Sequence, residues 1–236
     1  MRKAILMSKS TIRIGIVSDV VCPWCYIGKR RLEKAMANVS DKYQFEVEYF
    51  PFELNPQMPR EGLDQRDYLT KKFGGEARYE QLTSHVAKVA EQEGLSFNFG
   101  AQKISPNTRT AHRIITLAKK DGNQLEVAEA FFKAYFIDGT DLSRNENLLQ
   151  LATQAGMNSR EVEKLLQGDE GSAEVEMAER ELQQMGITGV PFFIIDNKYG
   201  LSGAQPSEVF VKAFNEARHA DTSSAADACD LDEKNC

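Results

Sequence analysis

The feature that most constrains the fold is a strand pattern that runs into two cysteines and then into a helix pattern. Residues 11–21 (TIRIGIVSDVV) alternate and then become continuously apolar, with many β-branched side chains, which predicts a buried strand. A CPWC motif follows at residues 22–25. Residues 26–39 then carry apolar side chains at helical spacing. The sequence therefore predicts that both cysteines lie where a helix begins.

The beginning of a helix is a suitable place for a reactive thiol. The first backbone N–H groups have no acceptor within the helix, and the helix dipole places about half a positive charge there. Both effects stabilise a thiolate, and two intervening residues allow the sulfurs of Cys22 and Cys25 to form a disulfide. We therefore expect Cys22 to be the nucleophile. Cys25, one turn further into the helix, is expected to resolve the mixed disulfide.

The residues around the motif have more than one interpretation. Pro23 fits the first turn of a helix because its missing N–H has no partner there, and Trp24 is expected beside the sulfurs, where it would pack against a substrate. Asp19 is either an acid that holds or relays a proton or a hydrogen-bonded structural residue. A basic run either adds positive potential or, as the favoured interpretation, forms a solvated helix face; it comprises Lys29, Arg30 and Arg31.

A zinc site is the main alternative for a CxxC motif, and it requires a second pair of ligands at suitable spacing. The other cysteines, Cys229 and Cys236, are separated by six residues in an acidic C-terminal stretch, and His219 stands alone. We therefore expect a redox pair, no metal ligands and no cofactor.

Patterns along the rest of the chain predict the order of the remaining elements. A second strand is predicted at 44–50, a hairpin at 190–196 and 199–202, and a last helix ending near residue 220. Ser143 with Glu146, and Asn158 with Glu161, have the spacing of capping boxes. Helical spacing predicts the segments between, at 65–73, 77–93, 108–120, 125–137, 144–155, 159–166 and 173–185.

Together these elements predict an α/β protein with a thioredoxin-like fold and a large all-helical insertion. The thioredoxin-like part is expected in two pieces, 11–62 and 173–220, on either side of a helical domain at 63–172. Residues 221–236 are small and polar and are expected to form a flexible acidic tail. An aromatic group at helical spacing is expected to pack in the core rather than bind substrate: Phe131, Phe132, Tyr135 and Phe136.

Composition narrows the partners and the compartment. The 236 residues carry a formal net charge of -6, which argues against nucleic acid as a main partner. No stretch of the sequence is long and apolar enough to span a membrane, and the apolar run at 4–7 is too short for a secretory signal. We expect a cytoplasmic protein. Paired cysteines in a reducing compartment are more often catalytic, sensing or metal-binding than structural.

The order of these motifs also carries a resemblance. Over residues 12–220, the strand, the CPWC motif, the helical insertion and the segment TGVP at 188–191 resemble the DsbA family of disulfide oxidoreductases, within it the FrnE-like branch. The resemblance implies a cis peptide between Val190 and Pro191 facing the redox pair, with the Val190 backbone free to pair with an extended substrate. It also implies that Asn107 lines the active-site groove and that His112 packs within the insertion.

The resemblance extends to the C-terminal cysteines. FrnE-like proteins can carry a second pair, which implies that Cys229 and Cys236 act as an auxiliary dithiol that exchanges with Cys22 and Cys25. The alternative is a pair of exposed thiols without a role.

The sequence thus predicts a thiol–disulfide oxidoreductase or isomerase that acts on protein dithiols and disulfides, with glutathione or a thioredoxin-type protein as a possible electron donor. One alternative is a glutathione-dependent isomerase or kappa-class-like glutathione transferase, which shares the fold but typically has serine in place of the nucleophilic cysteine. A second alternative is a redox-sensitive chaperone in which the insertion binds unfolded chains.

Overall fold

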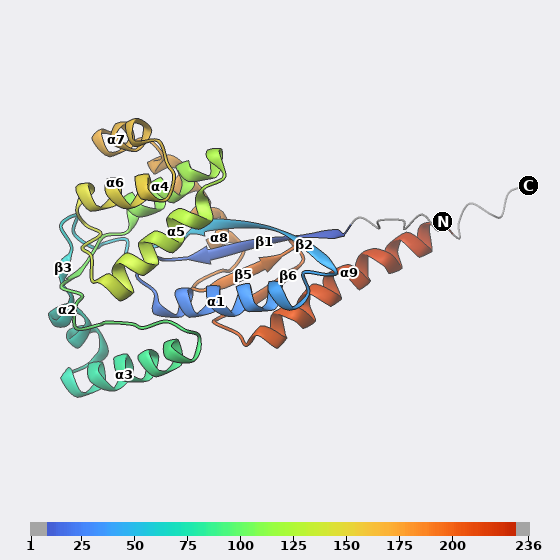
Figure 1. Cartoon of the computed structure of the whole chain (residues 1–236), viewed down its shortest axis with the longest axis horizontal. Helices are drawn as coiled ribbons and strands as arrows, with labels where there is room; N and C mark the ends of the chain where they lie inside the picture. The colour runs from blue at the N-terminus through green and yellow to red at the C-terminus, as the bar shows by residue number, and fades with distance from the viewer. Residues whose placement is uncertain (1–8, 230–236) are drawn as a thin grey trace, which may run out of the picture.

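A computed structural model describes the backbone of residues 9–229 and the side chains of residues 9–218. Its main sheet has the strand order β2-β1-β5-β6 (Figure 1). These strands are β1 (Ser10–Ser18), β2 (Tyr43–Pro51), β5 (Phe192–Ile195) and β6 (Tyr199–Ser202). β2 runs parallel to β1, whereas β5 is antiparallel to both β1 and β6. This arrangement confirms the predicted thioredoxin-like fold.

The helices fall into two groups along the chain. The first group belongs to the thioredoxin-like part: α1 (Pro23–Asn38), α8 (Ser172–Gln184) and α9 (Ser207–Cys229). The second group forms the insertion with the short strands β3 (Leu63–Asp64) and β4 (Ile104–Ser105): α2 (Gln65–Phe73), α3 (Glu76–Gln92), α4 (Arg109–Ala118), α5 (Gln124–Lys133), α6 (Asn145–Gln154) and α7 (Ser159–Gln167). A 3₁₀ turn (Lys119–Asp121) follows α4, and a π-helical turn (Ala134–Asp138) follows α5.

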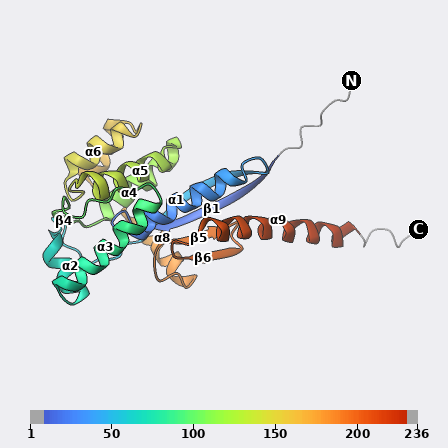
Figure 2. The same cartoon turned by 60° about the horizontal axis from the view of Figure 1, so that its bottom comes forward.

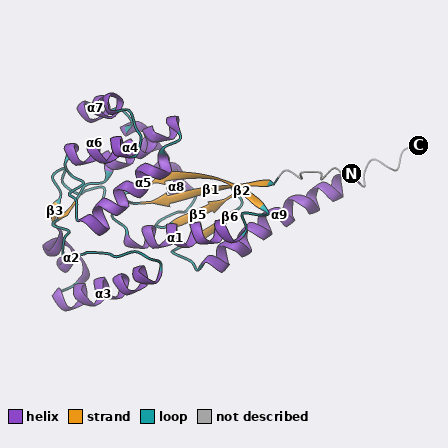
Figure 3. Ribbon diagram, viewed as in Figure 1, coloured by secondary structure: helices purple, strands orange, loops and turns teal. Residues whose placement is uncertain are grey.

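The apolar side chains of the central strand β1 are buried in two clusters. Ile12, Ile14 and Ile16 alternate along the strand into the main core, and Val17 packs in a smaller cluster with Leu182 of α8. Helices α1 and α9 pack side by side against the sheet (Figure 3). The alternating apolar residues identified in the sequence are therefore the ones that pack in the core.

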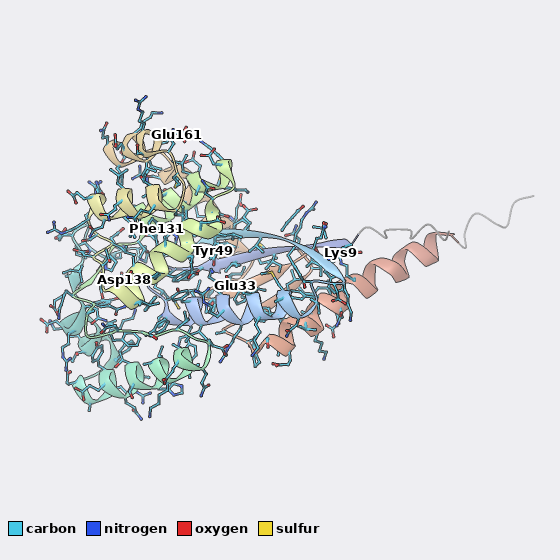
Figure 4. The ribbon with its side chains drawn as sticks, in the orientation of Figure 1. Lys9, Glu33, Tyr49, Phe131, Asp138 and Glu161 are labelled. Atoms are coloured by element: carbon cyan, nitrogen blue, oxygen red, sulfur yellow. The ribbon has the colours of Figure 1, made fainter. Side chains whose placement is uncertain are left out.

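One side chain of the insertion takes the place of a strand partner on the edge strand β2. Gln124, the first residue of α5, accepts a hydrogen bond from the Tyr49 backbone N–H (2.9 Å) and donates one to the Tyr49 carbonyl oxygen (3.1 Å). A carboxamide that does both replaces a missing strand partner. Tyr49 is thereby fixed in the interior where α5 passes over the sheet (Figure 4).

Aromatic rings hold the insertion to α1. Tyr26 stacks on Phe132 with 5.0 Å between ring centroids, and Phe97 stacks on Phe136 at 4.7 Å. The rings at 131, 132, 135 and 136 are all buried, as predicted for core packing. Tyr135 and Phe136 also line the groove described below.

The C-terminal helix is longer than predicted. Instead of ending near residue 220, α9 continues to Cys229, and its last turns project away from the body of the molecule (Figure 2). The predicted end of the last helix near residue 220 is therefore wrong. The physical reason is that the stretch after residue 220 is rich in alanine and that residues 207–229 contain neither glycine nor proline.

Three smaller local expectations are also corrected. The first strand ends at Ser18 rather than continuing to Val21, because a turn begins at Asp19. Ser143 does not cap α6, since its hydroxyl donates to Asp141 instead, whereas Asn158 caps α7 as predicted. The pairing of β3 with β4 was not expected; two-residue strands leave no periodic signal in a sequence.

Candidate active site

The CPWC motif lies at the start of α1, where a tight turn joins it to β1. The Cys22 backbone N–H donates to the Asp19 carbonyl oxygen (3.0 Å), and Cys22 is the N-cap residue with Pro23 in the first turn. The Cys25 N–H in turn donates to the Cys22 carbonyl oxygen (3.0 Å). Both cysteines are buried free thiols, with 4% of Cys22 and 1% of Cys25 exposed. The expected placement at a helix start is therefore observed.

The two thiols differ in their surroundings. Desolvation raises the pKa of the Cys25 thiol well above its ordinary value, and the neighbouring Cys22 sulfur adds to the rise. The Ser18 hydroxyl and the backbone at Asp19 oppose it by stabilising the anion. Cys22 instead lines a groove at the molecular surface. The Cys25 thiol is therefore protonated at rest and loses its proton only during a reaction.

The segment before β5 faces Cys22. The Val190–Pro191 peptide bond is cis, and Cys22 Sγ lies 3.9 Å from the Val190 carbonyl oxygen. Gly28 lets α1 approach this segment closely: a Cβ there would lie 3.3 Å from Pro191 Cγ and 3.0 Å from Phe193 Cζ. Sequence reasoning missed Gly28, because a glycine within a helix pattern shows a close approach only once its neighbour in space is known.

The groove beside Cys22 has a volume of about 380 Å³ and is mostly apolar. Walls from both parts of the protein form it, including Trp24, Leu54, Met58, Leu82, Phe99 and Val190. Trp24 is half-buried and packs near His85, with 6.2 Å between ring centroids. Of the predicted substrate-binding residues, Trp24 and Val190 therefore lie in the groove together with Cys22.

Asn107 does not lie in this groove, contrary to the expectation. Its side-chain amide donates to the Met58 carbonyl oxygen (2.8 Å), and its carbonyl oxygen accepts from the Arg109 backbone N–H (3.0 Å). Its neighbours Pro106 and Thr108 line the groove instead. Asn107 holds the loop before α4 in place, because both ends of its carboxamide are used by the backbone.

Asp19 and His112 form a buried pair between the motif and the insertion. Asp19 Oδ2 accepts from the Leu54 backbone N–H (2.8 Å), and Oδ1 lies 3.5 Å from His112 Nε2. Desolvation alone would lower the pKa of His112, but Asp19, with Glu53 and Glu179, raises it. His112 is buried within the insertion, as the resemblance implied, and Asp19 is hydrogen-bonded and also lines the groove.

The basic run does not form a solvated face, nor does it point at the sulfurs. Lys29 is 6% exposed and forms ion pairs with Glu33 and, at 2.5 Å, with Glu129 of α5. Arg30 pairs with the same two carboxylates, and Arg31 pairs with Glu93 (2.7 Å). The run therefore joins α1 to the insertion. The sequence did not reveal this role because Glu129 lies 100 residues from Lys29.

The C-terminal cysteines are not tested by the structure. Cys229 is the last residue of α9, and Cys236 lies outside the described residues. Their exchange with the CPWC pair stays a prediction. Among the side chains of residues 9–218, no cluster of three or more His, Cys, Asp or Glu is placed to hold a metal ion. None of the helices described here has the length and apolarity that crossing a bilayer requires.

Comparisons with known proteins agree with this geometry. The family model of the DSBA-like thioredoxin domain matches residues 13–215. The uncharacterized protein YwbO of Bacillus subtilis is 27% identical over 207 residues, which are 87% of this chain and 97% of YwbO. The crystal structure of the probable DsbA oxidoreductase SCO1869 from Streptomyces coelicolor is 36% identical, with a TM-score of 0.81, and the match covers 88% of this chain and 90% of that one.

A more distant structure shares the fold alone. The cytosolic disulfide reductase DsbM from Pseudomonas aeruginosa, solved with GSH, is 17% identical with a TM-score of 0.60 over 88% of this chain and 99% of its own. The FrnE-like branch stays a prediction. The match to the family model over most of the chain and the likeness to SCO1869 show that the protein belongs to the DSBA-like thioredoxin domain family and is a thiol–disulfide oxidoreductase of the DsbA type.

Proposed function

We propose that the protein exchanges disulfides with protein substrates through Cys22 and Cys25. The observation that carries the proposal is the placement of Cys22: it caps α1, lines the groove and lies 3.9 Å from the Val190 carbonyl oxygen, with Cys25 buried one turn behind it. The Cys22 thiolate attacks a substrate disulfide, forms a mixed disulfide and releases one substrate thiolate. Cys25 then attacks Cys22 Sγ, which releases the second substrate thiolate and leaves the Cys22–Cys25 disulfide.

The shape of the groove supports an extended peptide as substrate. The backbone of Val190 lies beside Cys22, so a chain on either side of a substrate cysteine would hydrogen-bond there in the manner of an added strand. The apolar walls would accept a large apolar side chain next to that cysteine. Pro191, joined to Val190 by a cis peptide bond, offers no N–H that would compete for the sulfur.

We further propose a cytoplasmic reductase or isomerase that takes electrons from glutathione. The support is the likeness in fold to DsbM, a cytosolic disulfide reductase solved with GSH. The same likeness keeps a glutathione-dependent isomerase as the second candidate. The two thiols favour disulfide exchange over that candidate, because both are present at the start of α1.

The test is the reduction of insulin and the reactivation of scrambled ribonuclease, each with glutathione as reductant. Wild-type protein is expected to accelerate at least one reaction, and Cys22→Ser is expected to abolish the acceleration. Cys25→Ser is expected to accumulate mixed disulfides with substrate, since the resolving thiol is gone. Equal activity of wild type and Cys22→Ser would contradict the proposal.

A further inference from the structure

The groove beside Cys22 contains one accessible charge. Of the described residues that line it, only Asp19 and Lys72 are charged. Asp19 is 1% exposed and accepts a hydrogen bond from the Leu54 backbone N–H. Lys72, in the last turn of α2, is exposed. A molecule that enters the groove therefore meets a positive charge and no accessible negative one.

The charge of Lys72 is not neutralised by the part of the chain whose side chains the structure describes. No carboxylate of residues 9–218 lies within ion-pair distance of it. Glu76 and Glu80 of the neighbouring helix α3 both pair with Arg66 instead. The ammonium contacts Tyr68: Nζ donates to the hydroxyl oxygen (3.4 Å) and lies 5.5 Å from the ring centroid. A neutral phenol leaves the positive charge available to an anion.

Tyr68 is half-buried and also lines the groove. Its hydroxyl oxygen accepts from Lys72 and, across from the loop after β2, from Asn55 Nδ2 (3.2 Å). A phenol whose oxygen accepts two hydrogen bonds still carries its own proton. Among the described residues this proton has no acceptor. Tyr68 is therefore free to donate to a molecule in the groove.

The orientation of the Asn55 carboxamide is fixed by its own loop. Its Oδ1 accepts from the Gln57 backbone N–H (3.2 Å), so its Nδ2 faces Tyr68. One of the two N–H groups of Nδ2 is used by Tyr68, and the other remains. The ammonium of Lys72, the phenol of Tyr68 and the amide of Asn55 thus form a donor cluster that line the groove together. A cluster of donors with one positive charge and no free acceptor favours an anion.

We propose that the donor cluster of Asn55, Tyr68 and Lys72 binds a carboxylate of the molecule whose sulfur reacts with Cys22. The inference rests on the proposed function. Both kinds of molecule that exchange there carry carboxylates: polypeptides on Asp and Glu side chains, and glutathione at its two ends. Leu69 and Phe73, which line the groove beside Lys72, keep part of the water away and so strengthen the ion pair. The cluster selects among disulfides and thiols of equal intrinsic reactivity.

The experiment compares carboxylates with their neutral counterparts in two arms. In the first, glutathione and its esters at one or both carboxylates reduce the Cys22–Cys25 disulfide. In the second, reduced protein reacts with short peptides that carry a mixed disulfide on one cysteine and either Glu or Gln at each nearby position in turn. Rapid quenching and peptide mass mapping give the second-order rate constants. The ratio of the rate constants for the acidic and neutral forms is the preference.

Wild-type protein is expected to prefer the acidic form by about 3–10-fold in at least one arm, the size of one charge-assisted hydrogen-bonded pair at a partly exposed position. Salt at about 0.5 M is expected to reduce this preference, since it screens the ion pair. Lys72→Met is expected to lower the preference to less than about twofold, and Lys72→Arg to retain most of it. Tyr68→Phe is expected to lower it by about half, because one donor is lost and the charge remains.

Lys71→Met is the matched control. Lys71 precedes Lys72 on the same helix and is exposed, but it is not among the residues that line the groove. Its loss removes the same net charge from α2 and is expected to leave the preference unchanged. Because esterification also alters the reagent itself, the informative quantity is the change in preference between variants.

A preference that depends on Lys72 in the first arm would identify glutathione as the source of the carboxylate, and one in the second arm would identify acidic polypeptides. The same preference in wild type and Lys72→Met in both arms would overturn the carboxylate site and leave the proposed function intact. Equal losses in Lys71→Met and Lys72→Met would also overturn it, since general charge would then be the cause. Wild-type protein that exchanges with none of these reagents would contradict the proposed function itself.

Discussion

Cys22 and Cys25 are three positions apart in the sequence, yet their side chains have different surroundings. Cys22 lines an apolar groove of about 380 Å³, whereas Cys25 is 1% exposed and is not among the residues that line the groove. One turn of α1 is enough to separate them. Cys22 thus faces an open apolar surface, whereas burial raises the pKa of the Cys25 thiol and keeps it protonated.

The largest expected difference between the two thiols is in reactivity. With iodoacetamide at pH 7, we expect Cys22 to be alkylated at least about 100-fold faster than Cys25, because burial holds the pKa of Cys25 well above its ordinary value. Raising the pH toward 9 should reduce this difference in alkylation rate only slightly. Peptide mass mapping after timed quenching measures both rates.

The control for this comparison is Cys22→Ser, in which Cys25 is the one thiol left in the motif. Its Cys25 is expected to stay slow, since desolvation is the main cause of the raised pKa and the Cys22 sulfur is secondary. Equal alkylation rates for both cysteines in wild type would contradict the expected difference in reactivity between the two thiols.

Charged side chains on the buried side of α1 hold the insertion against this helix. Glu129 accepts from Tyr26 OH (2.7 Å) and pairs with Lys29 and Arg30. We expect Glu129→Gln to lower the free energy of unfolding by about 1–3 kcal/mol, because it leaves the buried Lys29 ammonium with one carboxylate partner. Glu33→Gln, on the more exposed side of the same network, is expected to cost less than about 1 kcal/mol. Urea unfolding at pH 7 measures both.

The effect of Glu129→Gln on the free energy of unfolding is also expected to depend on pH. Burial alone would raise the pKa of Glu129, but hydrogen bonds from Arg30 and Lys29 outweigh it and lower the pKa. A lowered native-state pKa stabilises the fold above the ordinary value of the group, and this contribution is lost as pH falls through the lowered value. The difference in stability between wild type and Glu129→Gln should therefore shrink between about pH 5 and pH 3. A constant difference would show that ionised Glu129 contributes nothing.

Features that depend on neighbours in sequence were predictable. The strand, the CPWC motif and the helix after it follow from local spacing, and α2 and β6 begin and end at the predicted residues. Asn158 caps α7 because a cap needs only the next few residues. The start of the site was therefore readable from the sequence.

Features that depend on distant residues were not predictable. The hydrogen bond between Asn55 and Tyr68 joins the loop after β2 to α2, and no local pattern relates these two residues. Asn107 illustrates the converse: its position near the groove followed from the resemblance, but its carboxamide is taken up by the Met58 carbonyl and the Arg109 N–H. Which residue faces the groove is decided by such local hydrogen bonds, and the sequence does not give their geometry.

The smallest expected effect tests the apolar groove. Leu54 lines the groove and is 40% exposed, whereas Met177 on α8 is 55% exposed outside it. If an apolar substrate side chain packs on Leu54, Leu54→Gln should raise KM for an unfolded disulfide-bonded protein by about 3–10-fold, the loss of part of one apolar contact. The kcat and the exchange with a small disulfide should stay unchanged, because neither depends on that contact. Met177→Gln makes a similar change of polarity elsewhere and should leave KM unaltered. Equal KM values for the two variants would show that peptides reach Cys22 without using the apolar wall.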